Sequence, residues 1–331
     1  MLKLYNKKIN LYFSYLCIIL ALIAGERLLG IGPDFRNYEE IFSSTTISVE
    51  PAFRLFRIMS IQFGGANFAF LFFNIISLSF IYKAFKRYSP YPFVSFVFYS
   101  LTFFFLHEYT QIRAAVAIGI FFLSLEDIKN KDFKQYLVKT IMATCFHYSS
   151  IIMIVLYLFC QINKKSLYLF LPLFIFAIDL FLIYGLKQNI SLLCANYLKT
   201  LSNSSVEYFV NKIAYQGEII SLFNKQYLSY MGILIAMYFI CIKKTCNEKE
   251  FVIFKILSFT LCYWYFLLLS GLTVIIYRIP EFYAPVIVIV LPMLIKRFKE
   301  KELPALFSIL YILMHFKELY SKVVDWLKLY K

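Results

Sequence analysis

The sequence predicts an all-α, polytopic integral membrane protein with about 10–12 transmembrane or re-entrant helices. Three observations support this fold class. Hydrophobic residues make up 61% of the 331 positions and aromatic residues 20%, more apolar surface than a soluble domain of this length can bury. Many apolar runs approach the roughly 20 residues that cross a bilayer core as a helix. Lysine and arginine gather in the short breaks between these runs.

We expect a single transmembrane domain over residues 1–331, and its first span reads as an uncleaved signal-anchor. The longest polar connections are 26–52 and 187–226, and we expect the second to be a larger outer (periplasmic) loop. The short segment 52–62 mixes arginines with apolar residues and is expected to lie in the membrane interface. The expected spans lie at about 9–25, 67–82, 91–106, 111–125, 167–186, 227–242, 251–276, 282–295 and 303–316.

The net charge of +15 suggests nucleic acid in a soluble protein. Here the basic residues lie beside apolar runs, where they act as topogenic charge next to anionic lipid headgroups, so we expect no nucleic-acid partner. The seven cysteines form no CxxC pair and lie mostly in apolar runs, which disfavours both a metal site and a disulfide framework.

The segment 135–161 decides the topology. If all basic breaks are cytoplasmic, an even number of crossings separates them, and a single span here would place Lys164 and Lys165 outside. A hairpin that turns near His147 has arms of only about 13 residues, short for a full crossing, but returns every basic break to the cytoplasm. We favour the hairpin, or two short tilted helices. The breaks are Lys3, Lys7 and Lys8; Lys83, Lys86 and Arg87; Lys129, Lys131 and Lys134; Lys243, Lys244 and Lys249; and Lys296, Arg297, Lys299 and Lys301.

With this topology, a set of polar residues falls on the outer side. Outer arginines near span ends are uncommon, and each one inside the core costs roughly 2.5–3.5 kcal/mol, so Arg113 and Arg278 need partners. These are either structural carboxylates, Glu108 and Glu281, or a bound phosphate or diphosphate held by bidentate guanidinium contacts. The set comprises Arg27, Asp34, Arg36, Glu50, His107, Glu108, Gln111, Arg113, His147, Ser149, Ser150, Arg278 and Glu281.

His147 is a candidate general base, because a neutral imidazole at the hairpin tip can accept a proton from a sugar hydroxyl. It can equally be a hydrogen-bonded structural residue. Asp34 and Glu50 are rival bases, and His107 beside Glu108 can be a structural pair.

Short motifs follow one another in order: Arg27, Gly32, Asp34 and Tyr38; Glu50-Pro51; Gln111-Ile112-Arg113 with Ala114 and Ala115; Phe146-His147 with Ser149; and Arg278 with Phe282 and Tyr283. Over roughly residues 27–283 this order resembles the Wzy-type O-antigen and polysaccharide polymerases, specifically their EpsG-like branch. Pro33 departs from the small polar residue that the family usually has between Gly and Asp.

The resemblance implies a GT-C-like membrane glycosyltransferase of the bacterial inner (cytoplasmic) membrane, with its active site facing the periplasm. Such enzymes transfer the growing undecaprenyl-diphosphate-linked glycan onto a lipid-linked repeat unit, to build O-antigen, capsule or exopolysaccharide. It implies no metal and no other cofactor, and leaves open whether a chain-length regulator is a partner. The roles implied are a base from His147, Asp34 or Glu50; diphosphate binding by Arg27, Arg113 and Arg278; and support from Gln111, Tyr38, Ser149, Glu281 and Tyr283.

Two other classes stay open. A membrane polysaccharide O-acyltransferase also has about ten spans and a key histidine, but it takes acyl-CoA from the cytoplasm, which disagrees with an outer His147. A lipid-linked oligosaccharide flippase or transporter predicts two related halves and charges near the midplane. The sequence shows no internal repeat.

Overall fold

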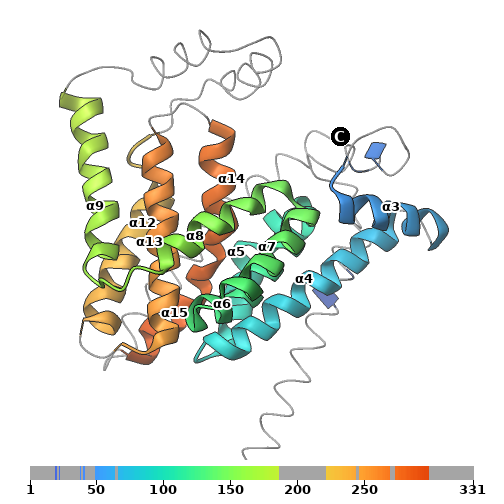
Figure 1. Ribbon diagram of the computed structural model, residues 1–331, viewed down its shortest axis with the longest axis horizontal. Helices are drawn as coiled ribbons and strands as arrows, with labels where there is room; N and C mark the ends of the chain where they lie inside the picture. Colours follow the sequence, from blue (N-terminus) through green and yellow to red (C-terminus); the bar gives the residue numbers. More distant parts are fainter. Residues whose placement is uncertain are drawn as a thin grey trace, which may run out of the picture. The chain divides into compact units, whose positions relative to one another are not determined.

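The computed structural model describes residues 49–63, 66–185, 221–243, 246–268 and 273–297, with isolated positions 19, 20, 22, 38, 40 and 41. The described residues form α-, 3-10 and π-helices and contain no strand, which confirms the all-α fold class. The chain divides into two compact units (Figure 1). The first unit is Met1–Tyr157 with Leu291–Lys331, and the second unit is Leu158–Val290.

In the first unit, α6 packs against both α4 and α7. A glycine permits the α4–α6 contact, because a Cβ on Gly119 would lie 3.1 Å from the Cβ of Phe80 and 3.2 Å from the carbonyl oxygen of Ser77. The helices are α3 (Pro51–Phe63), α4 (Ala66–Tyr88), α5 (Pro92–Thr102), the π-helix η1 (Phe105–Thr110), α6 (Ile112–Asn130), α7 (Phe133–Phe146), the 3-10 helix η2 (Tyr148–Ile152) and the start of α8 (Met153–Cys160).

The segment 135–161 is broken into two short helices at His147, which has an extended backbone (φ −152°, ψ 111°). The Tyr136 hydroxyl donates to the Met153 carbonyl at 2.9 Å, and the Tyr157 ring lies 5.2 Å from that of Phe133 and 4.8 Å from that of Tyr136. Since earlier residues of α7 meet later residues of α8, the two arms are antiparallel. The predicted hairpin is confirmed.

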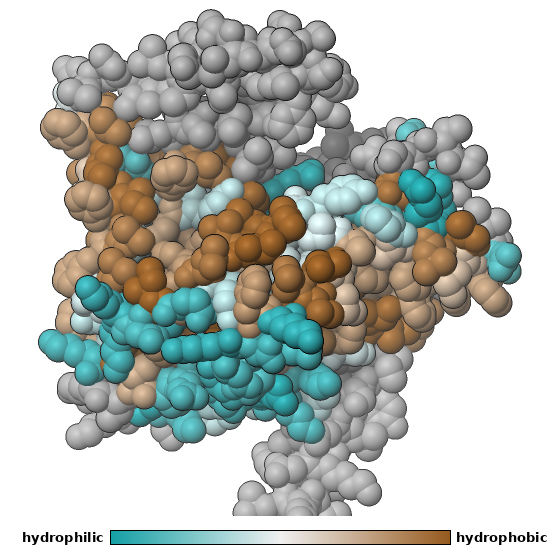
Figure 2. Space-filling view, in the orientation of Figure 1, coloured by the Kyte–Doolittle hydropathy of each residue, from teal (hydrophilic) through white to brown (hydrophobic). Residues whose placement is uncertain are grey.

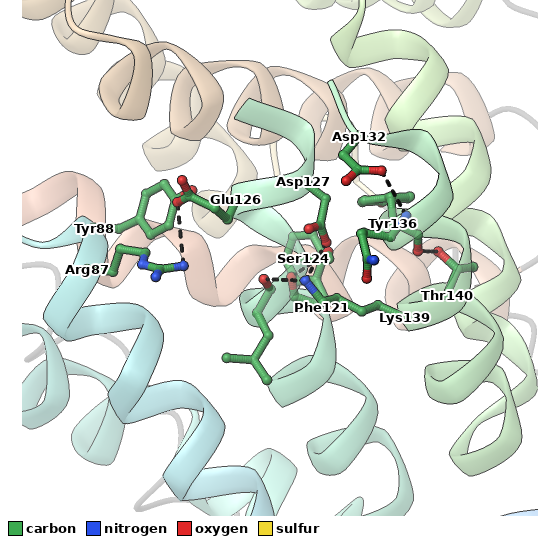
Figure 3. Close-up of polar contacts among 12 residues, drawn as sticks. Arg87, Tyr88, Phe121, Ser124, Glu126, Asp127, Asp132, Tyr136, Lys139 and Thr140 are labelled. Carbon is green, nitrogen blue, oxygen red and sulfur yellow. Dashed lines mark hydrogen bonds and ion pairs between the residues drawn. The ribbon is translucent and has the colours of Figure 1, made fainter. Parts of the chain in front are cut away.

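One end of the first unit is held by ion pairs (Figure 3). Arg87 at the end of α4 has its Nη1 3.7 Å from Glu126 Oε2, near the end of α6. Lys139 of α7 has its Nζ 2.6 Å from Asp127 Oδ2. The basic breaks after α4 and after α6 therefore lie at the same end of this unit, as the even-crossing argument requires.

In the second unit, α13 packs against α9, α12 and α14. Lys165 Nζ donates to the Ile242 carbonyl at 3.4 Å, so α9 begins beside the place where η4 ends. Lys165 and Lys243 consequently mark one basic end of this unit. The helices are α9 (Leu167–Leu180), the π-helix η3 (Phe181–Gly185), α12 (Lys225–Met237), the π-helix η4 (Tyr238–Ile242), α13 (Glu248–Leu268), α14 (Thr273–Tyr283), the 3-10 helix η5 (Ala284–Val286) and the start of α15 (Ile287–Arg297).

Five stretches among the described residues are long and apolar enough to cross a membrane: Asn67–Tyr88, Leu167–Gly185, Lys225–Ile242, Glu248–Leu268 and Ile276–Arg297. Figure 2 shows hydrophobic residues over the flanks of the helices and hydrophilic residues gathered at helix ends. The protein is therefore a multi-pass membrane protein. The expected spans 9–25 and 303–316, and most of the expected loop 187–226, lie outside the described residues.

Two expected boundaries are wrong. The span predicted over 251–276 covers parts of two helices, because α13 is Glu248–Leu268 and residues 273–276 belong to α14. Arg278 and Glu281 were expected between two spans. They instead lie in α14, inside the stretch Ile276–Arg297, because the helix continues through η5 into α15.

Candidate active site

The first unit brings together Glu50, Arg113 and His147, here called the Glu50 cluster. Arg113 Nη1 lies 2.7 Å from Glu50 Oε2. His147 Nδ1 lies 3.8 Å from Glu50 Oε1, which is longer than a hydrogen bond and is an ion contact when the imidazole is protonated. Glu50 directly precedes α3, Arg113 is in the first turn of α6, and His147 is the turn between α7 and η2.

A break in the backbone positions Arg113. The π-helix η1 ends at Thr110, and Gln111 takes a non-helical conformation (φ −105°, ψ 55°) before α6 begins. The guanidinium carbon of Arg113 lies 5.6 Å from the centroid of the Tyr38 ring and 5.5 Å from that of Phe53, within the range of a cation–π contact. Of the predicted supporting residues, Tyr38 touches this arginine, and Gln111 caps its helix.

Aromatic packing positions His147. The preceding residue, Phe146, has its ring 6.0 Å from that of Phe56 on α3 and 5.8 Å from that of Phe73 on α4. After the turn, the backbone N–H of Ser150 donates to the carbonyl of His147 at 3.0 Å. The predicted supporting residue Ser149 is half-buried in η2. Contacts from three helices therefore fix where the imidazole sits.

Glu50 is held as a carboxylate. Its residue is only 5% exposed, and burial raises the pKa of its carboxyl. The neighbouring His147 and the positive charge of Arg113 act in the opposite direction and prevail, lowering the pKa to about 2. A carboxylate with such a low pKa is a weak base at neutral pH, so the arrangement suits Glu50 to orienting its two partners.

Several buried polar atoms around the cluster have no hydrogen-bond partner in the described part of the chain. They are Nε of Arg113, Nδ1 of His147, both ring nitrogens of His107 and Oγ of Ser150. Buried polar atoms are nearly always satisfied by protein, water or ligand. His107 is near enough to His147 for the two rings to interact electrostatically. Sequence reasoning named these residues, but their shared lack of partners is visible only in the structure.

Glu108 is not the partner of Arg113. Its carboxylate is fully buried and accepts hydrogen bonds from the Tyr99 hydroxyl at 2.8 Å and from the Ser77 Oγ at 2.9 Å. The suggested Arg113–Glu108 pair is wrong, because η1 directs Glu108 between α4 and α5 whereas Arg113 meets Glu50 at the start of α3. No local sequence signal identifies Glu50 as the partner of Arg113, because the two residues lie 63 positions apart.

The remaining candidate residues lie outside the described part of the chain or in the second unit. Arg27 and Asp34 lie outside the described residues. Arg278, Glu281 and Tyr283 belong to the second unit, where Arg278 is exposed, Glu281 is half-buried and Tyr283 is buried. No group of three His, Cys, Asp or Glu side chains within the described ranges is placed to hold a metal ion.

The fold and the cluster define an all-helical, multi-pass membrane protein with a carboxylate–arginine–histidine site around a buried glutamate. The family model of the EpsG family matches residues 10–326, nearly the whole chain. The chain therefore belongs to the EpsG family, which confirms the resemblance to that branch and indicates a membrane polysaccharide-polymerase or glycosyltransferase-like role. No curated protein and no solved structure matches this chain.

Proposed function

We propose that this protein is a Wzy-type polymerase of the bacterial inner membrane. It transfers the growing undecaprenyl-diphosphate-linked glycan onto a lipid-linked repeat unit at the periplasmic face. The observation that carries the proposal is the Glu50 cluster, in which a carboxylate holds an arginine and a histidine side by side at 2.7 and 3.8 Å. Membership in the EpsG family and the apolar, membrane-length helices support it.

In this proposal Arg113 binds the diphosphate leaving group. Glu50 accepts from Nη1, while the buried Nε lacks a protein partner among the described residues. The guanidinium therefore keeps donors for a ligand, and its planar fork matches phosphate oxygens in bidentate fashion. Fixed donors of this kind stabilise the negative charge that develops on a departing group. Arg27 and Arg278 stay further candidates for diphosphate binding.

His147 is the proposed base. The hydroxyl oxygen of the acceptor sugar attacks the anomeric carbon of the donor glycan, and the bond from that carbon to the diphosphate oxygen breaks. The electron pair leaves with the diphosphate, and the hydroxyl proton passes to the imidazole. Glu50 beside His147 favours the imidazolium that forms. The low pKa of Glu50 makes it the weaker candidate base, and Asp34 stays the rival.

The reaction class is tested in the native host. Deletion of the gene should leave surface glycan with single repeat units and no ladder on a gel, and the wild-type gene should restore the ladder. An unchanged ladder with altered acylation would instead identify an O-acyltransferase. Loss of all surface glycan would identify a flippase.

The site is tested by complementing the same deletion with variants. Arg113→Ala, Arg278→Ala and His147→Ala should each abolish the ladder while the protein still accumulates in the membrane, as measured by immunoblot. Lys139→Met is the matched control, because this variant loses the ion pair of Lys139 in the middle of α7 with Asp127 of α6, which is not part of the Glu50 cluster, and it should polymerise normally. Normal ladders from both arginine variants would refute the diphosphate site.

A further inference from the structure

The second unit contains a buried polar group that the proposed reaction does not use. It consists of Asp179 on α9, Tyr227 on α12, and Trp264 and Tyr265 on α13, here called the Asp179 cluster. All four residues are almost completely buried, with exposures of 0–1%. They come from three different helices of the second unit.

Asp179 is an unusual residue for its helix. The membrane-length stretch that contains it is only 22% buried, so most of its side chains face outward, whereas Asp179 lies on the inward stripe with Tyr168 and Pro172. Its Oδ2 is buried and has no hydrogen-bond partner within the described ranges. An ionisable side chain in a membrane helix is costly and usually marks a functional site.

Three hydrogen-bond donors of the cluster are also unsatisfied: the hydroxyls of Tyr227 and Tyr265 and the indole Nε1 of Trp264 have no partner among the described residues. The Tyr227 and Trp264 rings stack at 3.5 Å. Tyr265 interacts electrostatically with both Asp179 and Tyr227. The four side chains therefore form one connected group with one strong acceptor and several donors.

The Asp179 cluster lies at the end of the second unit opposite Lys165 and Lys243. Lys165 beside Ile242 marks the basic end. Asp179 is in the last turn of α9, Tyr227 in the first turn of α12, and Trp264 and Tyr265 in the last two turns of α13. In the topology proposed above, this end is the outer one, where lipid-linked sugars are presented.

We propose that the Asp179 cluster binds hydroxyl groups of the carbohydrate portion of the lipid-linked substrate; this inference rests on the proposed function. A ligand must donate to Asp179 and accept from the indole and phenol groups, and sugar hydroxyls do both. The oxygen atoms of Asp179 are hydrogen-bond acceptors, as are those of phosphate, and the carboxylate of Glu281 acts on Tyr227, so both disfavour an anion here. The cluster therefore suits the sugar and not the diphosphate. A single buried water makes about three hydrogen bonds and would leave part of the cluster unsatisfied.

Trp264 provides the measurement, since the chain has two tryptophans. In purified full-length protein carrying Trp326→Phe, Trp264 is the sole tryptophan. The probe is the repeat-unit oligosaccharide released from its lipid carrier by mild acid. It should change the Trp264 emission saturably. Asp179→Asn should weaken binding about tenfold, the size expected for one hydrogen bond to a charged group, and Tyr265→Phe should also weaken it.

Glu248→Gln is the matched control, because Glu248 is an exposed carboxylate at the other end of α13 and should bind as the parent does. An emission that stays constant at saturating oligosaccharide, or unchanged binding by both Asp179→Asn and Tyr265→Phe, would overturn the inference and leave only buried water at the site. Undecaprenyl diphosphate is the second probe. Its binding should depend on Arg113 and not on Asp179, so failure of the diphosphate site is distinguished from failure of the sugar site.

Discussion

Glu50→Gln is the most informative single substitution in the first unit. The change keeps the shape of the side chain but removes the charge that pairs with Arg113 at 2.7 Å and with His147 at 3.8 Å. A displacement of the Glu50 pKa from 4.5 to about 2 corresponds to about 3 kcal/mol. Because Arg113 keeps 30% of its side chain exposed, water screens the pair, and we expect a loss of about 1–2 kcal/mol.

The pH dependence follows from the direction of this displacement. The folded protein holds the Glu50 proton less tightly than the unfolded chain, so the stabilisation is complete above the unfolded pKa of 4.5 and is lost as the pH falls through about 2. The part of the stability gap between the parent protein and Glu50→Gln that comes from the Arg113 pair should therefore be constant from about pH 8 to pH 5 and should shrink below pH 4.5.

The assay is thermal unfolding of both proteins in the same detergent across this pH range, with glycan ladders recorded in parallel. We expect an apparent Tm lower by roughly 2–6 °C at pH 7 and a strongly reduced ladder. The double variant Glu50→Gln with Arg113→Gln should lose less than the sum of the single losses. Equal stability at pH 7, or a gap that persists unchanged below pH 3, would refute the assignment of the Glu50 charge to this pair.

Three further predictions concern contacts in the first unit. Tyr99→Phe removes a donor to the buried Glu108 carboxylate and should lower the unfolding free energy by about 1–3 kcal/mol; an unchanged apparent Tm would contradict this. Lys139→Met should cost at most about 1 kcal/mol, because its ion pair is partly exposed, and a lost ladder would show that the pair has more than a structural role. Phe146→Ala should cost about 2 kcal/mol, less than the 3–5 kcal/mol for a fully buried ring, and should shorten the ladder by freeing His147; a full-length ladder in the glycan gel would argue against this positioning role.

The amino-acid sequence by itself predicted the all-α fold class and several of the membrane-length helices. Apolar runs and basic breaks are local features, and the energy of placing charge or bare backbone in lipid is large enough for them to fix the membrane segments. The hairpin at His147 followed from parity alone, and the antiparallel contacts of Tyr136 and Tyr157 confirm it. The boundary between α13 and α14 was predicted wrongly, because apolar composition does not show where one helix ends and the next begins.

Only the tertiary structure decided which of the candidate residues meet. The sequence suggested Glu108 as the partner of Arg113, but the non-helical backbone at Gln111 places the two side chains in different contacts. Helix packing instead brings Glu50, 63 positions away, to Arg113. Asp179 likewise looks like an isolated polar residue in the sequence, and its unsatisfied neighbours come from two other helices. Which side chains meet depends on how the helices pack against one another, and local sequence patterns do not give the distances between segments that are far apart in the chain.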